Sequence, residues 1–368
     1  MTAVKTSSKA LQLLSALLLL PAEQDQPTAS DHDIAGLSRS FPRSRADCES
    51  LESLAGSHHV IMRSFPALQR ELQARGLHDL AELCNGAIRK ERARIERALS
   101  FLEPICQALE ECGNLIVIKS LDHWPDLGND LDLYTDADPE AIVSRFKRHF
   151  NARVSQRSWG DRLANKWNFV IPGLQELVEV HVGRLGQTGE QTTVTNSLIR
   201  RANEIEVDGR VFRVPSFEDR LIISTLQRMY RHFYIRLCDI VDNAYTLQSD
   251  SVDYLYLRHM ARLTGLWPGL ATYLTVISDY VRTYCGEELP LPATITSAAR
   301  FRGERVHFQR NFLRIPLLPH SAGMYASELA RLLLRGEIRN TLRLSLLPGL
   351  ATAAALEFKL TGSDKGIW

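Results

Sequence analysis

The stretch NDLDLY at residues 129–134 decides how this chain folds. Acidic and apolar residues alternate along it, so an extended strand places Asp130 and Asp132 on one face and Leu131 and Leu133 on the other. This alternation predicts a strand with one buried and one polar face. Two unpaired carboxylates are costly to bury, so we expect them to meet cations, hydrogen-bond donors or water.

A second stretch, LVEVHV at residues 177–182, repeats the pattern. Its valines face one way, and Glu179 and His181 face the other. If both strands belong to one sheet, Asp130, Asp132 and Glu179 converge. Hard divalent cations such as Mg²⁺ prefer oxygen ligands, and two such ions serve phosphoryl transfer. An Asp-x-Asp strand is also typical of solvent-facing edges, and a histidine such as His181 more often supports a ligand than acts as one.

Other elements extend outward from these strands. An apolar run predicts a strand at 115–118, and Asp138-Pro139-Glu140 predicts the start of a helix that continues to residue 150. Further strands are expected at 153–156, 166–171, 204–207 and 211–214, the last two joined by a turn at Asp208-Gly209.

The rest of the chain predicts mainly helices. Residues 24–57 have the composition of a loop, and residues 77–109 have helical periodicity that we expect to break near Pro104. After a capping box at 216–219, helices are expected at 217–247, with a break near His232, and at 252–264, 270–284, 326–334 and 341–356.

Composition indicates an ordinary globular protein. The chain has 368 residues, with 44 Lys plus Arg against 43 Asp plus Glu, so net charge does not attract it to nucleic acid or anionic membrane. The six scattered cysteines form no CxxC pair and predict reduced thiols in a cytoplasmic protein. The apolar run 10–20 imitates a signal peptide, but we favour an amphipathic or buried helix, and no run is long enough for a transmembrane segment.

These motifs resemble those of a family. Ile118-Lys-Ser120, then Asp130-Leu-Asp132, then Val178-Glu-Val-His181 resemble the signature of an uncharacterised bacterial nucleotidyltransferase family in the DNA polymerase beta-like superfamily. The likeness extends to about residue 286, roughly half the chain. It implies that Asp130, Asp132 and Glu179 are catalytic residues and ligands of Mg²⁺ or Mn²⁺, with Glu179 helping to take the acceptor's proton.

The resemblance has departures as well as matches. Lys119 and Ser120 replace the usual glycine of the turn that approaches the triphosphate, and both are candidate nucleotide contacts. Asn129 stands where relatives often carry glycine or a charged residue.

A second candidate lies on the expected helix 217–247. His232, Arg236, Asp239 and Asn243 follow one another at spacings that form one stripe, which faces either solvent or the site. A helical domain closes one side of the cleft in the resembled family, so we assign Arg236 and Asp239 to base or ribose contacts.

The resulting hypothesis is an α+β protein. A small mixed-sheet nucleotidyltransferase core at 113–215 follows an N-terminal helical extension at 1–112 and precedes a helical C-terminal domain at 216–368. The expected reaction transfers a nucleoside monophosphate from a nucleoside triphosphate such as ATP to an acceptor hydroxyl on a small molecule, a protein or tRNA, and releases pyrophosphate. The alternatives are a non-catalytic binding protein with this fold and a metal-dependent glycosyltransferase.

Overall fold

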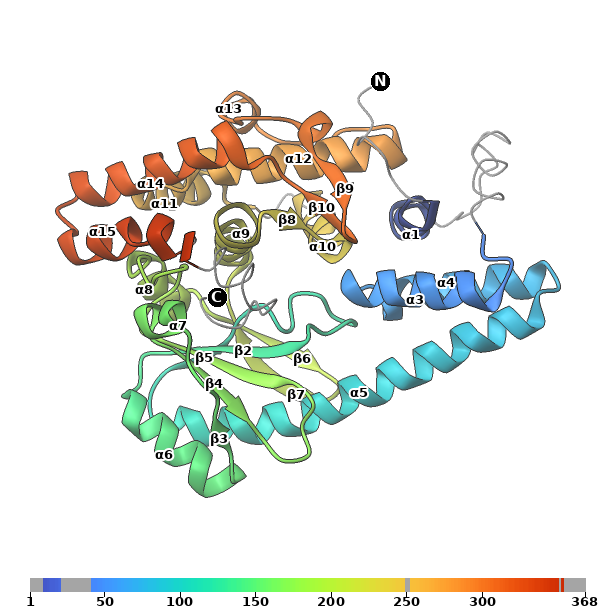
Figure 1. The fold of residues 1–368 in the computed structure, drawn as a ribbon, viewed down its shortest axis with the longest axis horizontal. Helices are drawn as coiled ribbons and strands as arrows, with labels where there is room; N and C mark the ends of the chain where they lie inside the picture. Colours follow the sequence, from blue (N-terminus) through green and yellow to red (C-terminus); the bar gives the residue numbers. More distant parts are fainter. Residues whose placement is uncertain (1–8, 21–40, 249–251, 351, 354–368) are drawn as a thin grey trace.

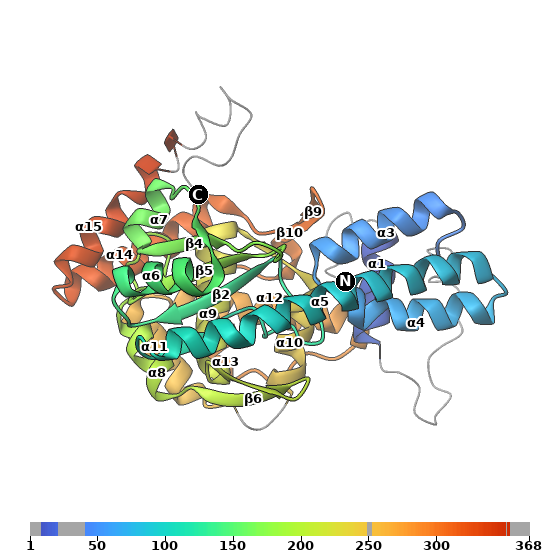
Figure 2. The same cartoon turned by 90° about the horizontal axis from the view of Figure 1, so that it is seen from below.

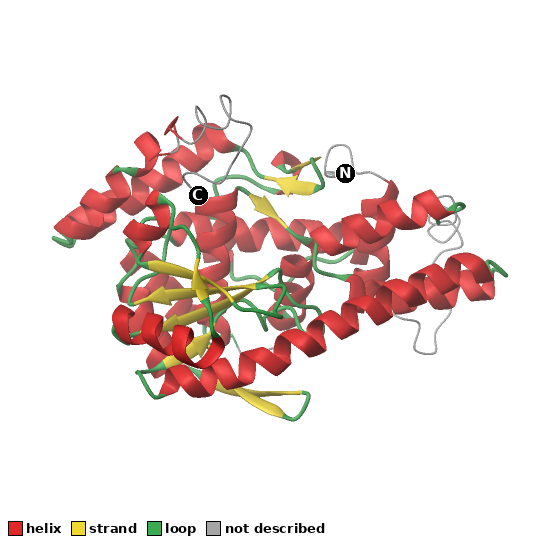
Figure 3. Ribbon diagram, turned by 60° about the horizontal axis from the view of Figure 1, so that its bottom comes forward, coloured by secondary structure: helices red, strands yellow, loops and turns green. Residues whose placement is uncertain are grey.

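The protein is described by a computed structural model that covers residues 9–20, 41–248, 252–350 and 352–353. It has a mixed helix-and-sheet architecture, consistent with the α+β class expected from the sequence (Figure 3). Within the described residues, no helix is both long and apolar enough to cross a membrane.

A five-stranded sheet with the order β1-β2-β5-β4-β3 forms the centre of the fold (Figure 1). Its strands are β1 (Leu115–Val117), β2 (Asp130–Thr135), β3 (Arg153–Val154), β4 (Lys166–Val170) and β5 (Leu177–Val182). Strands β2 and β5 pair in parallel, and the other pairs are antiparallel. The strands predicted from the sequence, their alternation and the mixed sheet are therefore confirmed.

One face of this sheet is apolar and packed. Leu131 and Leu133 of β2 and Val178 and Val180 of β5 are fully buried in a core shared with the second half of α5 (His78–Glu110). Helix α6 (Pro139–Phe150) covers the same face, and Asp138 caps it as predicted by accepting hydrogen bonds from two backbone amides. The acidic residues of β2 and β5 are thereby directed to the opposite face.

The hairpin β6 (Asn203–Val207) and β7 (Arg210–Val214) lies beside this core. Its turn residues Asp208 and Gly209 both have positive φ, 49° and 74°, which is the conformation that a two-residue hairpin turn requires. Two short helices, α7 (Trp159–Ala164) and α8 (Thr193–Arg200), complete the connections around the sheet and were not predicted.

The N-terminal helices pack on the C-terminal ones. Helix α1 (Lys9–Leu19) buries its leucines, and the Ser15 hydroxyl lies 2.7 Å from the hydroxyl of Tyr280 on α12 (Trp267–Cys285). Helices α3 (Arg45–Ser57) and α4 (Ile61–Ala74) pack along the first half of α5, beyond the sheet (Figures 1 and 2). Helix α5 thus joins two apolar cores: its first half packs in one and its second half packs in the other.

Two N-terminal predictions are wrong. Residues 45–57, expected within a loop, form α3, because Ser44 and Asp47 make a reciprocal capping box and Cys48, Leu51 and Leu54 pack inward. Helix α5 runs unbroken past Pro104, because both of its halves are held by buried side chains that outweigh one lost hydrogen bond. Residues 24–40 of the expected loop lie outside the described residues.

The C-terminal region is mostly helical, as expected. After α9 (Phe217–Thr225), the π-helical segment η1 (Leu226–His232) ends at Phe233, so the break near His232 is confirmed. Ser216 caps α9 by accepting from the Asp219 amide. The remaining elements are β8 (Tyr234–Ile235), α10 (Leu237–Leu247), α11 (Tyr254–Thr264), α12, α13 (Ala293–Thr296), η2 (Gly303–Arg305), β9 (His307–Gln309), β10 (Phe312–Arg314), η3 (Leu317–Ser321), α14 (Ala322–Leu334) and α15 (Ile338–Ser345).

The small sheet β8-β10-β9 is a feature that the sequence did not indicate. It contradicts the expectation that His232, Arg236, Asp239 and Asn243 form one stripe on one helix. The chain leaves η1 at Phe233, where φ is +56°, and β8 pairs with β10 before α10 begins.

Candidate active site

The acidic residues of β2 and β5 meet on the face of the sheet turned toward the C-terminal helices. Asp132 and Glu179 are direct partners in the parallel register, and Asp130 lies on the same face one pleat earlier. We call Asp130, Asp132 and Glu179 the sheet carboxylates. His181 lies on this face one pleat beyond Glu179, opposite Tyr134. The structure therefore brings the three predicted carboxylates to one face of one sheet.

Asp132 is the most buried of the three, with 9% of its surface exposed. Its carboxylate forms an ion pair with the Lys119 ammonium, and its Oδ1 lies 3.5 Å from Nε2 of His181. Burial opposes the charged form, but Lys119 and then His181 hold the pKa of Asp132 below its usual range. Burial lowers the pKa of His181 to about 4, so its ring is neutral near pH 7 and has a nitrogen available to a ligand.

Glu179 is held by a lysine from the neighbouring strand. The Lys166 ammonium lies 3.2 Å from both carboxylate oxygens of Glu179 and 3.0 Å from Oδ1 of Asp161 on α7. Lys166 is 4% exposed, so this cation is buried between two carboxylates. Burial works to raise the pKa of Asp161, but Lys166 outweighs it and the pKa is lowered.

Asp130 is the uncompensated member of the sheet carboxylates. Its side chain has no ion pair or hydrogen bond with any other described residue. Burial, then the charges of Glu179 and Asp132, raise the pKa of Asp130 to about 6, against the opposing effect of Lys119 and Lys166. A half-buried carboxylate beside two others is a place where a cation would be stabilising.

The donor set fits a divalent cation. Asp132, Glu179 and His181 each offer one ligand atom, and these atoms lie within 4.8 Å of one another. Both ring nitrogens of His181 are buried and make no hydrogen bond in the described chain, whereas Oδ1 of Asp132 is occupied by the Lys119 ammonium. The sheet carboxylates and Asp161 carry four negative charges when ionised, against two from Lys119 and Lys166. Carboxylate oxygens suit Mg²⁺, and the mixed set with His181 also suits Mn²⁺.

The turn before β2 gives Lys119 and Ser120 different positions. Lys119 has φ +64°, a left-handed conformation that favours the glycine which this turn lacks, and its ammonium reaches Asp132. Ser120 is 2% exposed, and its hydroxyl accepts from the Asp132 amide at 2.6 Å. Ser120 therefore ties the turn to β2, and the structure does not direct it at a nucleotide.

Arg236 and Asp239 are not brought to the sheet carboxylates. The Arg236 guanidinium lies over the rings of Tyr234 and Phe312. Asp239 is 1% exposed and belongs to what we call the α10 cluster, a network of buried charges between the loop 119–129, η1 and α10. The cluster consists of His123, Arg228, Asp239 and Asp242.

The α10 cluster is internally paired. Asp239 Oδ2 lies 2.7 Å from Nε of Arg228 and accepts from the Arg236 amide at 2.7 Å. Burial opposes its charge, but Arg228 and then His123 lower the pKa of Asp239. His123 contacts Asp242 through Nδ1, so the nearby His123, Cys238 and Asp239 atoms, which also lie close enough to hold a metal, already have partners. A structural role accounts for this cluster.

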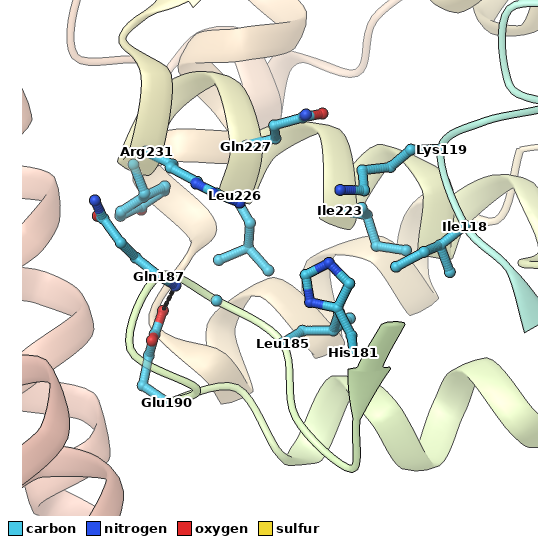
Figure 4. A pocket seen from close by; sticks show the side chains of 12 residues that line it. Ile118, Lys119, His181, Leu185, Gln187, Glu190, Ile223, Leu226, Gln227 and Arg231 are labelled. Atoms are coloured by element: carbon cyan, nitrogen blue, oxygen red, sulfur yellow. Dashed lines mark hydrogen bonds between the residues drawn. The ribbon is translucent and has the colours of Figure 1, made fainter. Parts of the chain in front are cut away.

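A small pocket opens between η1 and the end of β5, where His181 and Lys119 line it but the sheet carboxylates do not (Figure 4). Lys119 enters it from one side, Arg231 and Gln187 from the other, and His181 lies between them on β5. Arg231 is half-buried and forms no ion pair within the described chain, so its guanidinium is free for an anionic ligand. Lys166 and Asp161 line an adjoining hollow that His181, Gln187 and Arg231 also border.

Sequence reasoning missed two residues of this site. Lys166 begins an amphipathic strand, and that position was a usable signal. The sequence carries no signal for Arg231, because only the packing of η1 against the sheet brings this residue to the pocket.

Comparisons with known proteins add no assignment. No family model matches the chain, and neither the curated proteins nor the solved structures that were searched give a match. The function is therefore argued from the site itself.

Proposed function

We propose that this protein is a metal-dependent nucleotidyltransferase that transfers a nucleoside monophosphate from a nucleoside triphosphate to an acceptor hydroxyl. The observation that carries the proposal is the parallel register of Asp132 with Glu179, which places both beside Asp130 on one polar sheet face. The uncompensated charge of this face suits divalent cations.

Each charged group then has a role in the transfer. Asp132 and Glu179, with Asp130 and His181 beside them, hold Mg²⁺ or Mn²⁺. The bound metal supplies positive charge that stabilises the reacting phosphoryl group. Lys119 and Arg231 enter the pocket from opposite sides and bind triphosphate oxygens. Positioning and charge neutralisation account for most of the rate in this class of reaction.

The proton of the acceptor goes to Asp130. The acceptor oxygen forms a bond to the α-phosphorus, the bond from that phosphorus to the pyrophosphate oxygen breaks, and pyrophosphate leaves. Asp130 suits the proton better than Glu179, to which the sequence analysis assigned it, because Lys166 already holds Glu179.

Labelled substrates test the proposal directly. The protein is incubated with each of the four nucleoside triphosphates, labelled at the α-phosphate, with Mg²⁺ or Mn²⁺ and a cell extract. We expect metal-dependent labelling of an acceptor together with pyrophosphate release, and loss of both in Glu179→Gln. In a parallel incubation with sugar-labelled sugar nucleotides, labelling of an acceptor there and not from the triphosphates would instead indicate a glycosyltransferase.

One observation favours a non-catalytic binding protein as the second candidate. Lys119 and Lys166 already contact Asp132 and Glu179, so two ammonium groups stand where cations would bind. Saturable nucleotide binding that needs no divalent metal and gives no turnover would support this candidate over the transferase.

A further inference from the structure

A larger cavity adjoins the candidate active site. It has a volume of about 470 Å³ and lies between η1, η3, α14 and the end of α15. This volume is within the range of small-molecule binding sites, which is about 300–1,000 Å³. Its walls are mainly apolar and include Met229, Phe233, Leu317, Leu318, Leu344 and Leu347.

The cavity and the pocket of Figure 4 share a wall. Gln187, Glu190, Tyr230 and Arg231 line both. Gln187 and Arg231 also border the hollow at Lys166 and Asp161. The sheet carboxylates line neither space. Lys119 and His181, which contact Asp132, line the pocket beyond the shared side chains.

Two buried polar groups that line the cavity, Tyr230 and Glu328, offer hydrogen bonds to a ligand. The Tyr230 hydroxyl is buried and makes no hydrogen bond in the described chain. Glu328 on α14 is 1% exposed and accepts from the Gln191 amide nitrogen at 2.5 Å. Burial and then Glu190 raise the pKa of Glu328 well above its usual range, which favours its protonated, hydrogen-bond-donating form.

Glu190 itself is already satisfied by its own loop. Its carboxylate accepts from the backbone amides of Gln187 and Thr188 at 3.1 and 2.8 Å, and from the Thr188 hydroxyl at 3.0 Å. Gly186 makes this possible, because a Cβ there would lie 2.0 Å from Oε1 of Glu190. Burial raises the pKa of Glu190, against the opposing effect of these hydrogen bonds. Glu190 is therefore held by its own loop and leaves the polar contacts of the cavity to other residues.

We propose that the cavity binds the acceptor of the transfer, and that this acceptor is a small molecule with an apolar body and a hydroxyl group. The inference rests on the proposed function. The apolar walls hold the body, Tyr230 and Glu328 offer hydrogen bonds to its polar groups, and its hydroxyl reaches the sheet carboxylates past Gln187 and Arg231. That hydroxyl receives the nucleoside monophosphate and gives its proton to Asp130.

The first experiment measures binding without requiring any activity. The fluorescent apolar probe N-phenylnaphthylamine is titrated into the full chain, and n-octanol or octanoate is then added as a competitor. We expect saturable binding that n-octanol displaces, because the cavity walls are mainly apolar. Octanoate tests whether Arg231, which also lines the cavity, accepts a carboxylate. No saturable binding, or no displacement by n-octanol, would overturn the proposal.

A matched pair of variants locates the probe. Ala322→Trp adds a large side chain at an exposed position that lines the cavity, and Ala326→Trp adds the same side chain one turn later on α14, outside the lining. We expect Ala322→Trp to weaken probe binding by roughly tenfold or more and Ala326→Trp to leave it unchanged. Equal effects would place the probe elsewhere and contradict the cavity.

A second experiment tests the acceptor assignment independently of the proposed transfer reaction. In the labelled-triphosphate assay, the organic-soluble labelled product should fall in Ala322→Trp and persist in Ala326→Trp. Product that is unaffected by Ala322→Trp would refute the acceptor assignment while the proposed transfer stands. Probe binding at this cavity with no product from wild type would support the binding site and refute the transfer.

Discussion

The sheet carboxylates and the α10 cluster are both groups of buried charges, but they differ in how their charges are compensated. Asp239 of the α10 cluster has a guanidinium and a backbone amide, each 2.7 Å away. Asp130 of the sheet carboxylates has no such partner among the described residues, and burial raises its pKa to about 6. Paired charges account for a stable contact between elements, whereas uncompensated carboxylates indicate a place for a ligand.

The largest expected effect is a loss of stability when an ion pair of the α10 cluster is removed. Arg228→Ala leaves Asp239 buried without its guanidinium, so the free energy of unfolding should fall by about 3–5 kcal/mol, measured by urea denaturation. Asp130→Asn is the matched change among the sheet carboxylates. It should leave the free energy of unfolding unchanged or raise it, because it removes the repulsion between Asp130 and the other two carboxylates. Similar losses for both variants would erase the distinction between the two regions.

The second-largest effect is a loss of transfer activity when Glu179 is changed. Glu179→Gln removes a metal ligand and should lower transfer activity on the order of 10²–10³-fold, a loss typical of removing a key electrostatic group. The protein should stay folded, because Lys166 keeps its ion pair with Asp161 at 3.0 Å.

His181→Gln is the control for that change. His181 is already neutral, since its pKa is lowered to about 4, so the variant should retain substantial activity with no strong pH dependence between about pH 6 and 8. An inactive His181→Gln beside an active Glu179→Gln would require a histidine-based mechanism or a different metal.

A smaller effect concerns pH. Because the pKa of Asp130 is raised from 3.8 to about 6, the folded protein holds a proton that the unfolded chain has lost between these values. Stability without metal should therefore fall as pH rises through this window, and Asp130→Asn should remove that part of the slope. Thermal unfolding at several pH values, with and without Mg²⁺, measures it. Protons compete with metal, so the Mg²⁺-induced rise in melting temperature should be larger above pH 6 than below it.

The smallest effect concerns Lys119. Lys119→Gly removes the ammonium that competes for Asp132 and relieves a left-handed backbone position, so Mn²⁺ affinity should increase by roughly 1 kcal/mol, about fivefold. Calorimetric titration with Mn²⁺ measures this change. Weaker binding would mean that Lys119 organises the site for the metal instead of competing with it.

What the sequence could predict depended on local periodicity. Alternation in β2 and β5 was enough to place Asp130, Asp132 and Glu179 on one face, because the side-chain period of a strand is fixed. The caps at Asp138 and Ser216 were also local signals, and both were confirmed.

The failures have a common physical cause, which is contact between distant parts of the chain. Arg236 and Asp239 were assigned to the nucleotide by helical spacing, but the pairing of β8 with β10 interrupts that helix. Arg231 reaches the pocket only because η1 packs beside the sheet. Pro104 fails to end α5 because packing on both sides outweighs a local preference.

The central claim is that the sheet carboxylates bind a divalent cation, and uptake of Mn²⁺ tests it most directly. Free Mn²⁺ is followed by electron paramagnetic resonance as wild type, or the double variant Asp130→Asn with Asp132→Asn, is titrated into it. Wild type should take up Mn²⁺ in a saturable way, and excess Mg²⁺ should displace the bound Mn²⁺. The folded double variant should show no such saturable, Mg²⁺-displaceable uptake. Equal uptake by the two proteins would contradict the metal site and, with it, the proposed transfer.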